Sequence, residues 1–305
     1  MLRGILAAGT AFTLWGVFPL YLRLMKQVPS LEILSHRVLW SVVLLMGLLT
    51  IRRQWDWLAS VRARPRIVLT FVASALMLAT NWVVYIWSVN HDHIIDASLG
   101  YFITPLFNVL FGIGLGERLR LTQWLAVALA ACGVVWLTVS AGQLPWIGLV
   151  IAVTFSLYGL LRKTAALGAL EGLSIETLVL LPAASLFLLL PNAGSSHAFG
   201  SDVTLTLLLI SAGPVTAIPL LMFAYGARRI PLSLMGLLQY IGPSIQLLIG
   251  VWLFNEPFGG NNLIGFALIW LGLLIYSGNS LARSITTRSD QQEKKSPGEY
   301  QAKSN

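Results

Sequence analysis

Ten apolar stretches divide almost the whole chain, and they constrain its fold more than any other feature of the sequence. They lie near residues 2–22, 31–51, 67–89, 97–116, 122–141, 145–161, 174–191, 203–226, 232–254 and 262–282. Most reach the roughly 20 apolar residues that a helix needs to cross the hydrocarbon core of a bilayer. With 56% hydrophobic and only 10% charged residues, the composition indicates a membrane protein, not a soluble domain.

The few polar residues within these stretches recur every three or four positions, which is the period of a helix. Strands of a membrane β-barrel would instead alternate every second residue. The sequence therefore predicts an all-α polytopic membrane protein with ten transmembrane helices. These helices use most of the length, and we expect only a polar, disordered cytoplasmic tail at 283–305.

The chain also contains an internal repeat. A polar stripe recurs 138 positions further on, where Ser98, Tyr101, Pro105, Asn108 and Gly112 become Gly236, Gln239, Pro243, Gln246 and Gly250. AFTLWG at 11–16 recurs as TFSLYG at 154–159, and the triplet at 30–32 recurs at 174–176. We therefore divide the chain into a first five-helix repeat at 1–142 and a second at 143–282.

The placement of positive charge gives the orientation. Of the 20 Lys and Arg residues, 17 fall on one side of the predicted membrane, whereas Arg23 and Lys26 fall on the other and Arg37 lies within the second helix. The positive-inside rule then makes both termini cytoplasmic. Because each repeat has an odd number of helices, the second begins on the opposite side and is inverted. Inverted repeats are typical of secondary transporters, since exchanging the conformations of two similar halves alternates access between the two sides.

Pro105 and Pro243 occupy matched positions in the middle of their helices. A proline there has no N–H and clashes with the carbonyl four residues back, so we expect free carbonyls at Tyr101 and Gln239. In lipid such groups must face protein or a water-filled cavity, and matched interruptions point to a transporter binding site. The alternative is the general enrichment of proline in membrane helices.

A second polar stripe marks the third predicted helix. Ser74, Asn81, Tyr85 and Ser88 are spaced so that they share one helical face, which we expect to point inward. Asn81 either hydrogen-bonds a substrate or pins its helix to a neighbour.

Aromatic residues extend the predicted cavity. Trp15 and Tyr158 occupy equivalent repeat positions, and their flat surfaces suit an amphipathic organic molecule, although aromatic packing alone also explains them. The predicted substrate-cavity residues are Trp15, Asn81, Tyr85, Tyr101, Pro105, Asn108, Tyr158, Gln239, Tyr240, Pro243 and Gln246.

Ionisable residues near the membrane are few. Glu32 and His36 lie one turn apart at the start of the second helix, where they form either a proton-handling pair or a structural pair. Glu117 and Glu256 follow the matched stripes, and we expect solvated helix ends there. The loop HDHIID at 91–96 has metal-ligand residue types without the spacing of a known site, so we predict no metal and no cofactor.

The sequence resembles a known family at several motifs. The stretch SLGYFITPLFNVLFGIGLGERL at 98–119 is similar to the EamA-type half of the drug/metabolite transporter superfamily. SHRVLWS at 35–41, ETLVLLP at 176–182 and QYIGP at 239–243 resemble its RarD group, the chloramphenicol-sensitive proteins. The resemblance spans roughly residues 4–280. It implies ten helices in two five-helix repeats around a central cavity, cytoplasmic termini, and permease activity in the bacterial inner membrane.

These observations predict a secondary-active transporter of a small organic metabolite or drug-like compound that works by alternating access. A passive channel is the first alternative, and an intramembrane lipid-modifying enzyme is the second. The sequence shows no nucleotide-binding or clustered catalytic motif, so we expect a protein that is not an enzyme. Its expected partners are a small-molecule substrate and the lipid bilayer, with no nucleic acid. The sequence does not indicate an oligomeric state.

Overall fold

The computed structural model describes residues 2–63, 65–114, 121–142, 144–190, 198–227, 229–230, 238–272 and 274–275. Its helices, in chain order, are α1 Leu2–Arg23, α2 Ser30–Arg52, α3 Trp57–Ala63, α4 Pro65–Asn90, α5 Ile94–Gly114, α6 Leu121–Ala141, α7 Trp146–Thr164, α8 Ala169–Leu189, α9 Val203–Ala227, α11 Ile241–Leu248 and the π-helical turn η1 Ile249–Leu253. A further helix, Gly260–Gly272, follows η1. No strand occurs in these residues, which confirms the all-α class.

Helix length and hydropathy confirm a polytopic membrane protein. Five helices, namely α1, α2, α4, α8 and α9, are long and apolar enough to cross a bilayer. The other predicted spans correspond to apolar helices that are shorter within the described residues. The outward-facing side chains are apolar as well, since Leu69, Val139 and Trp252 are 71%, 74% and 75% exposed. Such a surface is favourable against lipid and costly against water.

The short helix α3 was not anticipated, because it lies between the apolar stretches predicted at 31–51 and 67–89. Trp57, its first residue, is buried in a cluster with Leu49, Phe71 and Leu170. Burial of this large ring anchors the segment against α2, α4 and α8, which explains why the loop folds into a helix.

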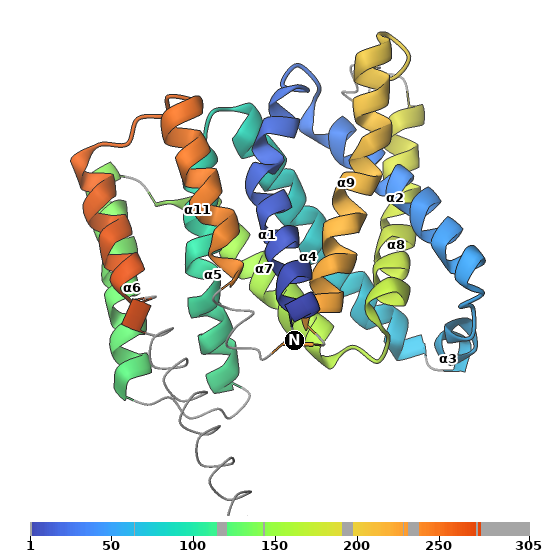
Figure 1. The fold of residues 1–305 in the computed structure, drawn as a ribbon, viewed down its shortest axis with the longest axis horizontal. Helices are drawn as coiled ribbons and strands as arrows, with labels where there is room; N and C mark the ends of the chain where they lie inside the picture. The colour runs from blue at the N-terminus through green and yellow to red at the C-terminus, as the bar shows by residue number, and fades with distance from the viewer. Residues whose placement is uncertain are drawn as a thin grey trace, which may run out of the picture.

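The helices of the first predicted repeat pack mainly against helices of the second, and they do so reciprocally (Figure 1). Helix α1 packs on α9 and α11, while its counterpart α7 packs on α4 and α5. The counterparts α2 and α8 contact each other, as do α5 and α11. Exchanging the two predicted halves therefore reproduces the helix contacts between them.

The basic residues gather at one end of the bundle. Gly4, near the start of α1, lies against Arg229 at the end of α9. Arg52, Glu171 and Arg229 line one surface cleft there. Figure 1 shows the N-terminus and α3 at this same lower edge. The end with α3 is called the basic end below, and the end with Arg23 and Lys26 is called the opposite end.

Small residues allow the closest helix approaches. A Cβ atom on Gly213 of α9 would lie 2.3 Å from the backbone carbon of Trp40 on α2. At the same crossing, the Ser41 hydroxyl donates a hydrogen bond to the Gly213 carbonyl oxygen at 3.3 Å. Close backbone approach through small residues is the usual way in which membrane helices associate.

We predict that Gly213→Ala lowers the stability of the detergent-purified protein by about 1–3 kcal/mol, the range for overpacking a tight interface. The cause is contact with backbone atoms, which a side-chain rotation cannot relieve. Thermal unfolding followed by tryptophan fluorescence measures the change. Gly47→Ala is the control on α2, because a Cβ atom there meets nothing within 4 Å. An equal melting temperature for both variants would contradict the prediction.

Candidate functional site

A cavity lies between helices of both predicted halves. It encloses about 690 Å³ of empty space including its opening, and the centre of a water molecule can reach about 70 Å³ of it. Its wall consists of Phe12, Trp15, Phe18, Arg37, Leu78, Asn81, Trp82, Tyr85, Tyr101, Phe155, Thr216, Leu220, Gln239, Gly242, Pro243 and Gln246.

The structure brings most of the predicted cavity residues to this wall. Those that line it are Trp15, Asn81, Tyr85, Tyr101, Gln239, Pro243 and Gln246. They come from α1, α4, α5 and α11 and, for Gln239, from a helical residue shortly before α11, and these segments are far apart in the sequence. Their role as substrate contacts stays a prediction.

Asn81 uses its side chain to join three helices. Its Nδ2 donates to the Ile151 carbonyl oxygen at 3.0 Å and lies 3.2 Å from the Thr154 Oγ1. Its Oδ1 accepts a hydrogen bond from the Tyr101 hydroxyl at 3.3 Å. These bonds connect α4 to α7 and α5, so the geometry favours the pinning role for Asn81 over direct substrate recognition.

Arg37 is a charged residue of the cavity wall that the sequence did not predict to lie there. It lies on α2, is only 4% exposed, and donates from Nε to the Thr216 hydroxyl oxygen at 2.9 Å. Its guanidinium carbon lies 4.4 Å from the Trp82 ring centroid and 4.9 Å from that of Phe18. The available signal was a charged residue within an apolar span, which is a functional candidate by default because charge in the membrane is costly.

Known proteins with similar sequences decide the family. An EamA-like transporter family model matches residues 2–139. An uncharacterized transporter of Vibrio cholerae is 46% identical over 288 residues, covering 94% of this chain and 95% of that protein. Protein RarD of Escherichia coli is 44% identical over 276 residues, covering 90% and 93%. The chain belongs to the RarD group of the EamA-like transporter family.

Two further proteins are similar to this chain, one in sequence and one in fold. The chloramphenicol-sensitive protein RarD of Pseudomonas aeruginosa is 34% identical over 286 residues, covering 91% of this chain and 94% of that protein. A solved crystal structure shares the fold at 22% identity, with a TM-score of 0.58 and coverage of 89% and 96%. The RarD-group chain is thus a multi-pass membrane protein of a transporter family, which points away from an enzyme.

Four of the predicted cavity residues in this RarD-group chain are not placed on the wall. Tyr158 directs its hydroxyl at Glu176 Oε2, at 3.4 Å. The Tyr240 ring stacks on Phe102 with centroids 6.4 Å apart, in a neighbouring apolar cluster. The side chains of Pro105 and Asn108 lie outside the described residues.

The two predicted proline interruptions differ. α5 continues as a helix through position 105, so no interruption is found there. In the second repeat, Tyr240 forms a turn and α11 starts at Ile241, which leaves Pro243 in the first helical turn. A missing N–H is harmless in a first turn, because that donor has no partner within the helix.

Glu32 and His36 are both buried but are not cavity residues. The Glu32 carboxylate accepts a hydrogen bond from the Ala198 N–H at 2.8 Å, which ties α2 to the segment before α9. The His36 ring stacks on Phe199 with centroids 5.1 Å apart, and neither of its nitrogens has a hydrogen-bond partner within the described part of the chain. The structure thus supports the structural interpretation of Glu32, and a proton-handling role for the pair stays a prediction.

Glu256 was predicted to lie at a solvated helix end, and the structure shows that this prediction is wrong. It is 7% exposed, and its two carboxylate oxygens accept the N–H groups of Ile94 at 2.8 Å and Ile95 at 2.9 Å. The carboxylate therefore caps the positive end of α5 from the loop after η1. Burial raises the pKa of Glu256, although the two N–H donors oppose the rise. Its counterpart Glu117 lies outside the described residues.

The loop at the opposite end uses its acidic residues for ion pairing. Asp92 pairs with Arg23 and, at 2.6 Å, with Lys26. Hydrogen bonds, from Lys26 first, hold the pKa of Asp92 below its usual value. His93 lies 3.1 Å from Asp96. Within the described residues, no group of three or more His, Cys, Asp or Glu side chains could hold a metal ion.

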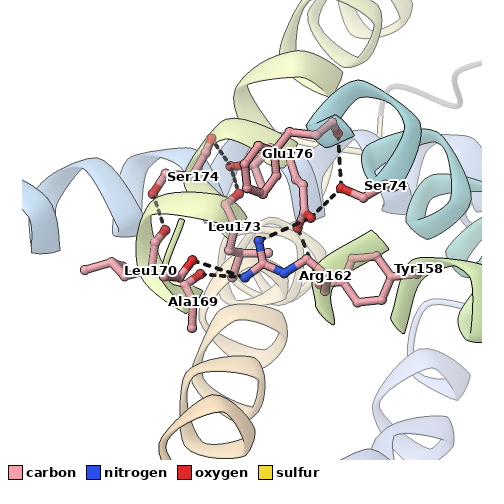
Figure 2. A network of polar contacts seen from close by, with 11 residues as sticks. Ser74, Tyr158, Arg162, Ala169, Leu170, Leu173, Ser174 and Glu176 are labelled. Atoms are coloured by element: carbon pink, nitrogen blue, oxygen red, sulfur yellow. Dashed lines mark hydrogen bonds and ion pairs between the residues drawn. The ribbon is translucent and has the colours of Figure 1, made fainter. Parts of the chain in front are cut away.

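A buried polar network joins α4, α7 and α8 (Figure 2), near the start of α8, where Glu171 lines the cleft at the basic end. Glu176 of α8 is 0% exposed and accepts a hydrogen bond from the Ser74 hydroxyl at 2.6 Å. Arg162 of α7 lies 3.6 Å from the same carboxylate and donates to the Gly168 carbonyl oxygen at 3.2 Å. Figure 2 shows the guanidinium between Glu176 and the backbone at the start of α8.

This network lies one helical turn from the cavity. Ser74 is four residues before the wall residue Leu78, and Tyr158 is three residues after the wall residue Phe155. Residues three or four apart share a helix face. The network of Ser74, Tyr158, Arg162 and Glu176 therefore connects α4, α7 and α8 just beyond the cavity, and it is called the Glu176 network below.

We predict that Gly172→Ala disrupts the Glu176 network, although Gly172 is not itself a member of that network. A Cβ atom at Gly172 would lie 1.7 Å from Arg162 Nη1, so the guanidinium must move away from Glu176. Leaving a buried carboxylate uncompensated costs about 3–5 kcal/mol, and we expect a similar loss for Arg162→Met. Thermal unfolding of both single variants and the double variant measures the coupling.

Because both substitutions remove the same ion pair, the double variant should be about as stable as either single variant. Glu176→Gln should partly rescue Gly172→Ala, since it removes the charge that lost its partner. Gly159→Ala on α7 is the control, because a Cβ atom there meets nothing within 4 Å. Additive losses without rescue would show that Gly172 acts independently of the ion pair.

Proposed function

We propose that this chain is a secondary-active transporter that moves a small organic metabolite or drug-like compound across the bacterial inner membrane by alternating access. One observation carries the proposal: a single cavity takes its wall from helices of both halves, α1, α2, α4 and α5 on one side and α7, α9 and α11 on the other. A site shared between two halves opens to either side when the halves rock against each other.

The proposed arrangement is ten transmembrane helices in two inverted repeats, 1–142 and 143–282, with both termini in the cytoplasm. The reciprocal packing of α1 with α9 and α11, and of α7 with α4 and α5, supports the inversion. The concentration of Arg52 and Arg229 at the end that holds the N-terminus supports the orientation through the positive-inside rule.

The two ends of the bundle carry different closing contacts. At the basic end, the Glu176 network joins α4, α7 and α8 one turn from the cavity. At the opposite end, Glu256 joins the segment after η1 to the start of α5, and Asp92 holds Arg23 and Lys26. In the proposed cycle the Glu176 network opens when the basic end opens. Removing one partner would therefore shift the population of the two states.

A passive channel is the second candidate function. The wall of the cavity is mainly apolar and aromatic, whereas a channel for ions requires a continuous polar path. Ion current in planar bilayers would favour the channel, and saturable flux without current favours the transporter. The lipid-modifying enzyme would require a catalytic cluster, and the loop at 91–96 instead engages Asp92 in ion pairs with Arg23 and Lys26 and Asp96 in a contact with His93.

We predict that Gln239→Ala reduces transport. Its side chain lines the cavity, and within the described residues it has no hydrogen bond to another part of the protein. Loss of one hydrogen bond to a substrate corresponds to about a 2- to 10-fold drop in flux. The measurement uses proteoliposomes with an imposed pH gradient and a panel of small organic compounds, quantified inside the vesicles by mass spectrometry.

Gln27→Ala provides the matched control, because Gln27 is exposed in the loop between α1 and α2. Asn81→Ala should also reduce flux, but with a lower melting temperature, since Asn81 joins three helices. Wild-type flux in both Gln239→Ala and Asn81→Ala for every transported compound would refute the cavity as the transport site.

A further inference from the structure

The cavity contains a buried positive charge without a negative partner. Arg37 is 4% exposed and forms no ion pair within the described residues. Its Nη1 is buried and has no hydrogen-bond partner in the same part of the chain. The other described wall residues include no Asp or Glu, so Arg37 is the one charged side chain among them.

The surroundings of Arg37 fix which part of the guanidinium is available. The ring of Trp82 and the ring of Phe18 lie over it at 4.4 Å and 4.9 Å, and Thr216 accepts the hydrogen bond from Nε. Cation–π contacts stabilise the charge and restrict the plane of the group. The edge of the guanidinium that carries Nη1 has no such contact. This edge is the part of an arginine that binds carboxylates.

A structural role alone does not account for this arrangement. An uncompensated charge inside a membrane protein is costly, and such residues normally pair with each other or line a ligand path. The ring contacts and one bond to a neutral hydroxyl offset that cost only in part. An anion entering the cavity would complete the pairing, so the missing partner corresponds to a ligand.

Two other wall residues indicate what else this ligand carries. The Tyr85 hydroxyl and the Gln246 Oε1 are buried without hydrogen-bond partners in the described residues. Gln246 is held in place because its Nε2 donates to the Trp15 carbonyl oxygen at 3.0 Å. The rest of the wall, including Phe12, Leu78 and Phe155, is apolar. A bound molecule thus meets one cation, a few polar atoms and a mostly apolar surface.

We infer that the substrate is a small organic anion whose carboxylate pairs with Arg37 while its apolar body packs against the aromatic wall of the cavity. This inference rests on the proposed transport function and names the class of its substrate. Neutral and cationic compounds of equal size leave Arg37 unpaired, so the site discriminates against them.

The test uses three probes that differ only in their charged end: 3-phenylpropionate, 3-phenylpropionamide and 3-phenylpropylamine. Each is titrated into the purified full-length protein while the melting temperature is recorded, because a ligand that binds the folded state raises it. We expect a saturable rise with the carboxylate, a weaker effect with the amide and none with the amine. This comparison needs no variant, so it does not depend on how variants fold.

Variants then assign the selectivity to Arg37. Arg37→Met should weaken carboxylate binding by about 10- to 100-fold, the effect of losing a hydrogen bond to a charged group. Arg37→Lys should weaken it less, since it keeps the charge. Arg62→Met, at an exposed position in α3, is the matched control and should bind as the wild type does.

Several results would overturn the inference. The first is that the amide or the amine binds as tightly as the carboxylate or more tightly. The second is that the carboxylate at millimolar concentration does not raise the melting temperature, or that sodium chloride alone raises it equally. The third is that Arg37→Met binds the carboxylate with wild-type affinity. Each of these results is compatible with saturable flux in proteoliposomes, so it would contradict the substrate class without contradicting transport. Absence of such flux, with carboxylate selectivity retained, would instead refute the proposed transport function.

Discussion

The pairing of buried polar groups is the constraint on which the rest of this structure depends. Within a bilayer, water is not available to satisfy backbone or side-chain groups, so each must find a partner inside the protein. Asn81 does so by joining α4 to α5 and α7, and Glu256 does so by capping α5. Glu176 is held by a serine, a tyrosine and an arginine. Arg37 departs from this pattern as a buried charge in the cavity wall that has no ion-pair partner in the described residues, and buried charges of this kind often mark function.

Divergence between the repeats explains why the cavity is asymmetric. Trp15 lines the cavity, whereas Tyr158 at the matching position turns its hydroxyl to Glu176. Glu32 and Glu176 also match in the repeat, yet one accepts a backbone N–H and the other forms an ion pair with Arg162. The same spacing that relates Glu32 to Glu176 relates Arg37 to Leu181, so the cation has no counterpart in the second half. The two predicted halves thus provide one cavity with unequal sides.

The sequence was sufficient for the fold class and for much of the cavity wall. Long apolar stretches and helical spacing specify membrane helices, and the polar stripe that contains Tyr101, Gln239 and Gln246 faces inward because lipid excludes it. The partners of each group could not be predicted, since they come from helices distant in the sequence. Glu256 was expected in solvent because nothing in its neighbouring sequence shows that the start of α5 packs against its carboxylate. The role of Arg37 could not be predicted, because the sequence alone does not show which helices surround this residue. Nor does it show that they offer no carboxylate to pair with the guanidinium.

Alternating access requires the two predicted halves to move against each other around one shared cavity. Pulsed electron paramagnetic resonance tests it most directly, with one spin-label pair at Gln27 and Val203 for the opposite end and another at Gln54 and Ala166 for the basic end, all exposed positions. Introducing Glu176→Gln, which weakens the contact at the basic end, should lengthen the distance at that end and shorten the distance at the other. Distances that stay constant, or that change in the same direction at both ends, would contradict alternating access.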